Sequence, residues 1–237
     1  MLEAAAGTCT GNRKSNQDRM FYQTDGQRGV FCVADGMGGT KDGHYAAELA
    51  VGAVQAWWES GEVSAEDFEL LFQAINEEIL SYATTQKTTL GTTLSLVFIE
   101  NETYTIAHTG DSRVYLVKKK LFGREVTMLT EDHTHAADQI RTGYSPQDVE
   151  KSPKKNMLTA CLGVFPTARV FITSGTLLKG SVFVVCSDGV YRILDEKAIG
   201  KLATMNKPAS EVASGLIEAV EGRRAKDNAS VVVGFMR

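Results

Sequence analysis

The chain has 237 residues, 43% of them hydrophobic, which is enough to bury a sizeable core, and one domain spanning residues 1–237 is expected. Its 25 basic and 29 acidic residues give a formal charge of −4, which provides no general attraction for nucleic acid or for an anionic membrane, so neither is expected as a partner. No repeat, low-complexity tract or linker indicates a second domain.

The first predicted elements are a strand and two helices. The apolar run at residues 30–34 predicts a strand that ends on Asp35-Gly36. Residues 45–58 and 65–82 have helical spacing, and the second stretch places its large apolar side chains on one face: Phe68, Leu71, Phe72, Ile75 and Ile79.

Three further strands are predicted in the middle of the chain. Residues 92–99 and 103–108 alternate around a short connection, and residues 114–117 follow almost at once. Such short links favour antiparallel neighbours, so a meander of adjacent strands is expected.

The carboxyl-terminal part repeats the first pattern. A second apolar run, VFVVCS, ends on Asp188-Gly189 and is followed by helical spacing at 195–203 and 208–220 and by a last strand at 230–236. Strands in runs with helices in pairs predict an α+β fold with antiparallel sheet.

The four cysteines are expected to be structural. They lack CxxC spacing, and Cys32 and Cys186 interrupt apolar runs, where cysteine behaves as a small buried hydrophobe. The start, MLEAAAGTC, has an early Glu3 and no basic segment before an apolar core, and no stretch is long enough to span a bilayer. We expect a cytoplasmic monomer without thiol-based catalysis.

Polar side chains stand at the edges of the strand-like runs. Taken singly, an Asp-Gly pair is a common turn. Together, Asp35 and Asp188 are expected to meet at one site, joined by residues from three other segments: Arg13, Asp18, Asp111, Asp227 and Asn228. Clustered aspartates without cysteine or histidine pairs favour Mg²⁺ or Mn²⁺ over zinc, and two such ions can activate water for attack on a phosphoryl group.

The ordered series RKSNQD, DGMGG, LGTT, TGDSR, EDHT, LTACLG, CSDGV and DNAS resembles the metal-dependent serine/threonine phosphatases, the protein phosphatase 2C family, in its compact bacterial form. The match runs from about Gly11 to the carboxyl terminus. The resemblance implies a four-layer α-β-β-α sandwich, with two central antiparallel sheets flanked by helix pairs. It also implies hydrolysis of phosphoserine and phosphothreonine in proteins, reversing a bacterial serine/threonine kinase.

The resemblance also implies a role for each site residue. Asp35 would bridge two metal ions, the Gly36 carbonyl would be a further ligand, and Asp188 and Asp227 would hold the second ion. Asp18 would orient metal-bound water.

Two residues remain from the matching motifs. Asp111 would help to bind a third, weaker metal, although an ordinary loop carboxylate is an alternative. Arg13 would grip the substrate phosphate with its planar fork of donors, although a solvated surface charge is an alternative. Asn228 is expected to support the turn or Asp227 and not to touch metal.

Some positions depart from the family pattern. Met37 and Thr40 stand where many relatives have histidine, so His44 is the candidate general acid, against a plain position at a helix start. Metal-bound water is the alternative proton donor. Gln17 replaces a frequent glutamate and Ala160 a frequent basic residue. His133 is expected to fix its loop.

Residues 133–156 resemble the flap that overhangs the catalytic face in bacterial members. Their glycine, prolines and lysines favour an exposed element over a core helix. Lys151, Lys154 and Lys155 would attract an acidic or phosphorylated partner, or form a plain solvated cluster.

Two other functions stay open at this point. One is a catalytically silent domain that binds phosphoproteins, whose signature would be a lost metal ligand. The other is a metal-dependent hydrolase of small phosphate esters.

Overall fold

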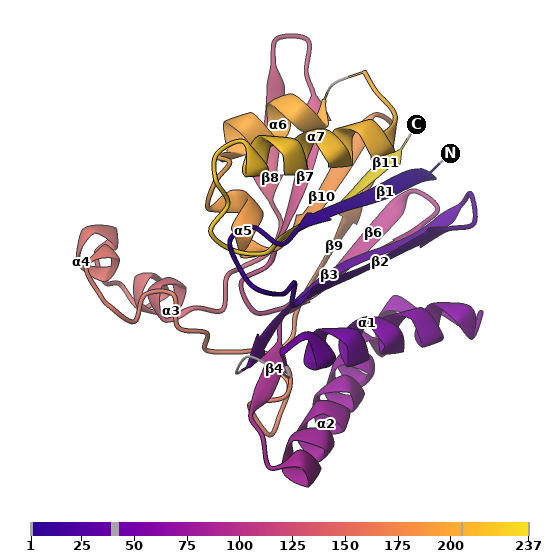
Figure 1. Cartoon of the computed structure of the whole chain (residues 1–237). Coiled ribbons are helices and arrows are strands. Elements are labelled where there is room, and N and C mark those ends of the chain that lie inside the picture. The colour runs from indigo at the N-terminus through magenta and orange to yellow at the C-terminus, as the bar shows by residue number, and fades with distance from the viewer. Residues whose placement is uncertain (1, 39–42, 205, 237) are drawn as a thin grey trace.

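A computed structural model describes residues 2–38, 43–204 and 206–236. Two β-sheets are stacked face to face, and a pair of helices covers the outer side of each sheet (Figure 1). The four-layer α-β-β-α sandwich implied by the family resemblance is therefore confirmed.

Both sheets are antiparallel throughout. The first has the order β1-β11-β10-β7-β8 and the second the order β2-β3-β5-β6-β9, with β4 paired to β3. The strands of the first sheet are β1 (Leu2–Cys9), β7 (Arg113–Lys119), β8 (Arg124–Met128), β10 (Ser181–Cys186) and β11 (Ala229–Met236). Those of the second are β2 (Asp18–Thr24), β3 (Arg28–Gly38), β4 (Leu90–Thr92), β5 (Leu94–Glu100), β6 (Thr103–Thr109) and β9 (Phe171–Thr176).

The predicted helices are present with bounds close to those expected. α1 (Gly43–Glu59) and α2 (Phe68–Gln86), the latter preceded by the short 3₁₀ helix η1 (Ala65–Asp67), cover the second sheet. α6 (Glu196–Ala203) and α7 (Ala209–Glu221) cover the first sheet. Among the described residues, none of the helices combines the length and apolar character needed to cross a bilayer.

Strand β3 shows why its sequence is apolar without alternation. Phe31 and Val33 point between the sheets, whereas Cys32 and Ala34 face α1 and α2, so both sides of the strand are buried. All four cysteines are buried and free of disulfides, as expected.

The expected meander is wrong in two respects. Residues 92–99 divide at Thr93 into β4 and β5, and the strand predicted at 114–117 is β7, which lies in the other sheet between β10 and β8. The corner before β7 contains Gly110 at a φ of 104°, a conformation that glycine adopts without strain, and the chain crosses there from one sheet to the other. This short link therefore joins strands of the two different sheets and not neighbouring strands of one sheet.

The segment expected to form a flap projects from the body of the sandwich (Figure 1). It contains α3 (His135–Arg141) and α4 (Pro146–Glu150), and its two stems pair through a bridge between Thr134 and Leu158. Most of its residues are exposed, although Val149 is buried.

Candidate active site

A cleft of about 660 Å³ opens at the edge of the sandwich where segments from both sheets meet. Seven residues predicted from the sequence line it: Arg13, Asp35, Gly36, Asp111, Asp188, Asp227 and Asn228. Its other lining residues are Asn12, Lys14, Ser15, Gln17, Met37, Gly38, Thr93, Asn156, Leu158 and Arg192. The distant motifs therefore converge on one site.

The two Asp-Gly pairs have different local structures. Asp188 begins the short helix α5 (Asp188–Tyr191) just after β10 ends, so the prediction that this strand ends at the Asp-Gly pair is confirmed. Asp35 does not end its strand, because β3 continues to Gly38, so that expectation is wrong.

The glycines in both pairs are needed for close backbone approach. A Cβ atom on Gly36 would lie 2.1 Å from the Gly43 carbonyl oxygen, and one on Gly189 would lie 1.9 Å from that of Asn228. Each aspartate is thus fixed where two segments of backbone touch.

Asp18 is the innermost carboxylate. It lies directly opposite Asp35 in the β2–β3 pair, and its Oδ2 accepts a 2.8 Å hydrogen bond from the Ser187 hydroxyl of the other sheet. Its Oδ1 is buried and has no hydrogen-bond partner among the described residues. Buried carboxylate oxygens are rarely left unsatisfied, so this atom fits a site completed by a cation or by ordered water.

The cluster resists ionisation. Burial, followed by the charges of Asp18 and Asp188, raises the pKa of Asp35 well above its usual range. Burial also raises the pKa of Asp18 to about 6 and, with the charge of Asp188, that of Asp111 to about 7. Carboxylates held together against their mutual repulsion are suited to binding hard divalent cations, which supply the missing positive charge.

Two arginines contact these carboxylates. Arg13 Nη2 is 2.7 Å from Asp227 Oδ2, and Arg192 Nη2 is 3.0 Å from Asp188 Oδ2 and 3.6 Å from Asp111 Oδ2. In the part of the chain that the structure describes, no three His, Cys, Asp or Glu side chains already enclose a space for an ion. The donor set is all oxygen and converges on one cleft, which fits Mg²⁺ or Mn²⁺.

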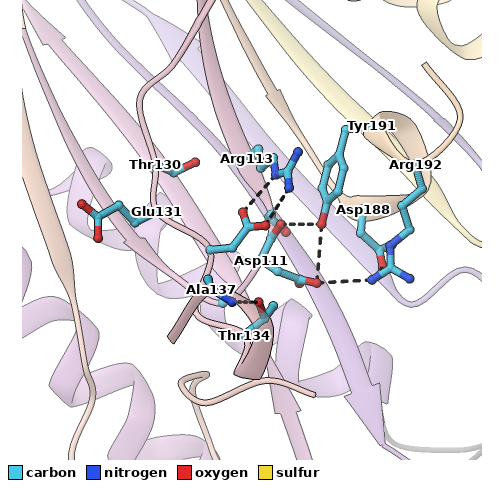
Figure 2. Close-up of polar contacts among 12 residues, drawn as sticks. Asp111, Arg113, Thr130, Glu131, Thr134, Ala137, Asp188, Tyr191 and Arg192 are labelled. Carbon is cyan, nitrogen blue, oxygen red and sulfur yellow. Dashed lines mark hydrogen bonds and ion pairs between the residues drawn. The ribbon is translucent and has the colours of Figure 1, made fainter. Parts of the chain in front are cut away.

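Arg192 is a cleft residue that the sequence reasoning missed. Figure 2 shows its guanidinium beside Asp111 and Asp188, with Tyr191 next to it. The available signal was its spacing of four residues from Asp188 at a helix start, which places both side chains on one face.

The loop that carries Asp111 is held by a second arginine (Figure 2). Arg113 makes a two-pronged contact with Asp132 at 2.9 and 2.7 Å, and its guanidinium lies 3.8 Å from the centre of the Tyr191 ring. The Tyr191 hydroxyl donates a 2.9 Å hydrogen bond to the Asp111 carbonyl. The TGDSR and EDHT motifs therefore support each other and position Asp111.

The histidines do not line the cleft. The Gly110 amide donates to His133 Nδ1 at 3.2 Å and the His133 amide donates to the Gly110 carbonyl at 2.7 Å, so the expectation that His133 fixes its loop is confirmed. Burial lowers the pKa of His133 to about 4 and that of His108 to about 3. His44 lies at the start of α1, and its acid role stays a prediction. Thr40 lies outside the described residues.

Asn228 holds the segment that carries Arg13. Its Oδ1 accepts from the Gln17 amide at 2.9 Å, and its Nδ2 donates to the carbonyls of Thr10 and Ser15 at 2.9 and 3.0 Å. The bonds of its side chain are all to backbone, and its own amide donates to Asp227 Oδ1 at 2.9 Å, which agrees with a supporting role and not a ligand role.

The flap contributes to the cleft through Asn156 and Leu158. Lys155 pairs with Glu150, and Lys151 lies 3.5 Å from Asp148. These internal pairs favour the solvated-cluster interpretation of the lysines, while attraction of a partner stays a prediction.

Comparisons with known proteins show the family to which the chain belongs. A family model described as protein phosphatase 2C matches residues 8–224. The serine/threonine phosphatase stp of Listeria monocytogenes is 32% identical over 238 residues, covering 93% of this chain and 90% of that protein.

Solved structures give the same result for the fold. The serine/threonine phosphatase of S. agalactiae superposes with a TM-score of 0.91 at 25% identity, over 100% of both chains. The catalytic domain of the phosphatase PstP, in complex with 2 manganese ions, has a TM-score of 0.82 at 24% identity, covering 99% of this chain and 97% of that one.

Replacing Asp35 by Asn should stabilise the protein in the presence of chelator. The pKa of Asp35 is raised in the folded protein. The protein therefore loses stability as the pH rises from the pKa of an unfolded aspartate, about 4, through the pKa of the folded one. At pH 7.5 the variant should melt at a higher temperature, by about 2 to 4 °C for each kcal/mol of repulsion relieved. Thermal melting at pH 7.5 and 4.5 measures this, and the difference should shrink at pH 4.5.

The difference between variant and wild type is the proper readout. The lowered pKa values of His108 and His133 give both proteins the opposite pH dependence, because the unfolded histidines gain protons as the pH falls. Asp67→Asn, at a partly exposed position without a side-chain capping bond, is the control. An Asp35→Asn variant less stable than wild type at pH 7.5 would contradict this account of the cluster.

Proposed function

This chain belongs to the protein phosphatase 2C family and is a metal-dependent serine/threonine protein phosphatase, and we propose that the cleft described above is its active site. One observation carries the proposal. Carboxylates from five separate segments of the chain converge there with an arginine at the mouth: Asp18, Asp35, Asp111, Asp188 and Asp227 with Arg13. No local sequence constraint brings these segments together.

We propose that Asp35, the Gly36 carbonyl, Asp188 and Asp227 would hold a pair of divalent ions. Mn²⁺ and Mg²⁺ are the candidates for an all-oxygen donor set. When bound, such ions lower the pKa of water toward neutrality and neutralise phosphoryl oxygens.

The protein's own groups then act on water and substrate. Asp18 is buried beside Asp35, with one oxygen fixed by Ser187 and the other without a partner in the part of the chain that the structure describes, so it can accept a proton and orient the attacking water. Arg13 is half-exposed at the mouth and can grip the phosphate with two parallel donors. The proton donor to the leaving oxygen is proposed from sequence as His44, with solvent as the alternative.

We further propose that residues 1–237 form one catalytic domain that acts as a cytoplasmic monomer. Its substrates are phosphorylated proteins, and the proposed opposing enzyme is a bacterial serine/threonine kinase. The complete set of carboxylates in the cleft favours a working enzyme over a silent phosphoprotein-binding domain.

Hydrolysis of a phosphothreonine peptide should depend on Mn²⁺ or Mg²⁺ and fall at least about 100-fold in chelator, because the water loses its activation. Asp188→Asn should lose most turnover in both metals. Phosphate release measured with each metal, with chelator and on a panel of metabolite phosphates tests this. Equal rates in chelator would contradict the metal mechanism, and faster turnover of metabolites would favour a small-ester hydrolase.

Arg13→Ala should raise KM for the phosphopeptide by about tenfold or more while leaving metal affinity at least intact, because its guanidinium binds phosphate and not metal. Steady-state kinetics and metal titration measure the two effects separately. Arg28→Ala, which removes an arginine paired with Asp25 outside the cleft, is the matched control. Weakened metal binding at unchanged KM would place Arg13 in another role.

A third, weaker metal at Asp111 is also proposed, and Arg192 lies against that carboxylate. A guanidinium and a metal ion compete for the same oxygens, so Arg192→Gln should strengthen the weak metal binding. The affinity should rise about tenfold if removing this competition makes the binding free energy about 1.4 kcal/mol more favourable. Titration calorimetry with Mn²⁺ in wild type, Arg192→Gln and Arg28→Gln measures this. The weak event should vanish in Asp111→Ala. An unchanged isotherm in Arg192→Gln and Asp111→Ala would place any third ion elsewhere.

A further inference from the structure

An apolar tip projects from the side of the molecule that the cleft does not use. The hairpin of β7 and β8 rises beyond α6 in Figure 1. Its loop is closed by a 3.1 Å hydrogen bond from the Lys120 amide to the Gly123 carbonyl, so the two residues between them are held outward. Leu121 is 91% exposed and Phe122 is 93% exposed. Two large apolar side chains at full exposure on an ordered turn indicate a contact surface.

Basic residues surround this tip. Lys118, Lys119, Lys120 and Arg124 flank it on the hairpin, and Lys179 lies on the neighbouring turn between β9 and β10 beside the half-exposed Leu178. Glu125 is the one carboxylate on this part of the hairpin, paired with Lys120 at 2.9 Å. The overall charge of −4 therefore conceals a local positive excess.

The hairpin and the neighbouring turn enclose a cavity of about 380 Å³. Its lining has four lysines and one carboxylate: Lys118, Lys119, Lys120 and Lys179 with Glu125, beside Leu178, Gly180 and Ser181. Ser181 is 1% exposed, and its hydroxyl has no hydrogen-bond partner among the described residues. Ammonium groups around an unpaired hydroxyl are suited to a phosphate group.

We propose that this corner docks the protein on an anionic lipid bilayer. Leu121 and Phe122 enter the interface between headgroups and acyl chains, and the lysine-lined cavity takes a lipid phosphate. A convex apolar tip is buried most easily by a partner that can deform around it, and the fluid interface of a lipid bilayer can do so. The basic ring matches the negative potential of an anionic leaflet.

The same placement keeps the cleft accessible. β7 starts at Arg113, next to Asp111 in the cleft, and ends at Lys119 in the docking corner. The strand has seven residues, and its six steps of roughly 3.3 Å separate the two ends by about 20 Å. A protein docked by the hairpin therefore turns the cleft toward solvent, and the proposal does not depend on the metal chemistry.

Vesicle co-sedimentation tests the proposal. Wild type should bind vesicles of phosphatidylcholine with phosphatidylglycerol at least about tenfold more strongly than pure phosphatidylcholine, and high salt should weaken this binding. Leu121→Ser with Phe122→Ser, and separately Lys118, Lys119 and Lys120→Gln, should each lose about tenfold or more. Turnover of a soluble phosphopeptide should be unchanged in both variants, since neither touches the cleft.

Matched controls separate docking from general surface effects. Leu70→Ser removes an apolar side chain that is 72% exposed on α2, and Lys87, Lys151 and Lys154→Gln removes three lysines elsewhere. Both controls should bind like wild type. Because the four native cysteines are buried, Phe122→Cys can be labelled with an environment-sensitive dye, whose emission should shift to the blue with anionic vesicles alone.

Three results with vesicles would overturn the proposal. They are equal binding of wild type to neutral and anionic vesicles, wild-type binding by the Leu121→Ser, Phe122→Ser variant, and a dye at position 122 that stays in water while the protein is bound. Binding of an acidic peptide without any vesicle binding would also overturn it and would assign the corner to a protein partner.

Discussion

The structure depends on holding carboxylates close together against their mutual repulsion. Asp18 and Asp35 face each other across one strand pair, where like charges are destabilising. Asp188 and Asp227 approach the same cleft from the ends of the other sheet. The site thus straddles the seam between the sheets, and the apolar core that stacks them, with Phe31 and Phe183 fully buried in it, sets the separation of the charges. Catalytic geometry is in this sense a product of core packing.

Hydrogen bonds across the seam give that geometry its precision. Ser187, which follows β10 of the first sheet, donates to Asp18 of the second, and the Ser230 amide donates to the Ser187 hydroxyl at 3.0 Å. Asn228 ties the segment before β2 to the start of β11 by three bonds to backbone. These groups touch neither substrate nor metal in the proposed reaction. Their effect is to remove the freedom by which the carboxylates would otherwise move apart.

The sequence predicted those parts of the fold whose causes are local. The helical spacing of 45–58 and 65–82 and the apolar runs before Asp35 and Asp188 correspond to α1, α2, β3 and β10. The partner of β7 could not be predicted, because a short link around Gly110 serves a crossing between sheets as well as a hairpin. The carboxylates were found because their chemistry is restrictive. Arg192 and the pairing of Arg113 with Asp132 were missed, since such contacts depend on which segments meet in three dimensions.

The distribution of charge connects the two ends of β7. An acidic cleft repels a phosphorylated substrate unless positive charge stands at its mouth, which explains why Arg13 and Arg192 lie beside the very carboxylates that draw cations in. At the other end of β7, lysines outnumber carboxylates and the local charge is positive. An anionic surface would therefore repel the cleft and attract the hairpin, so long-range electrostatics alone would orient the molecule before the apolar tip made contact. A chain with nearly balanced charge can in this way be strongly polar, and its net charge is a poor guide to the surfaces it meets.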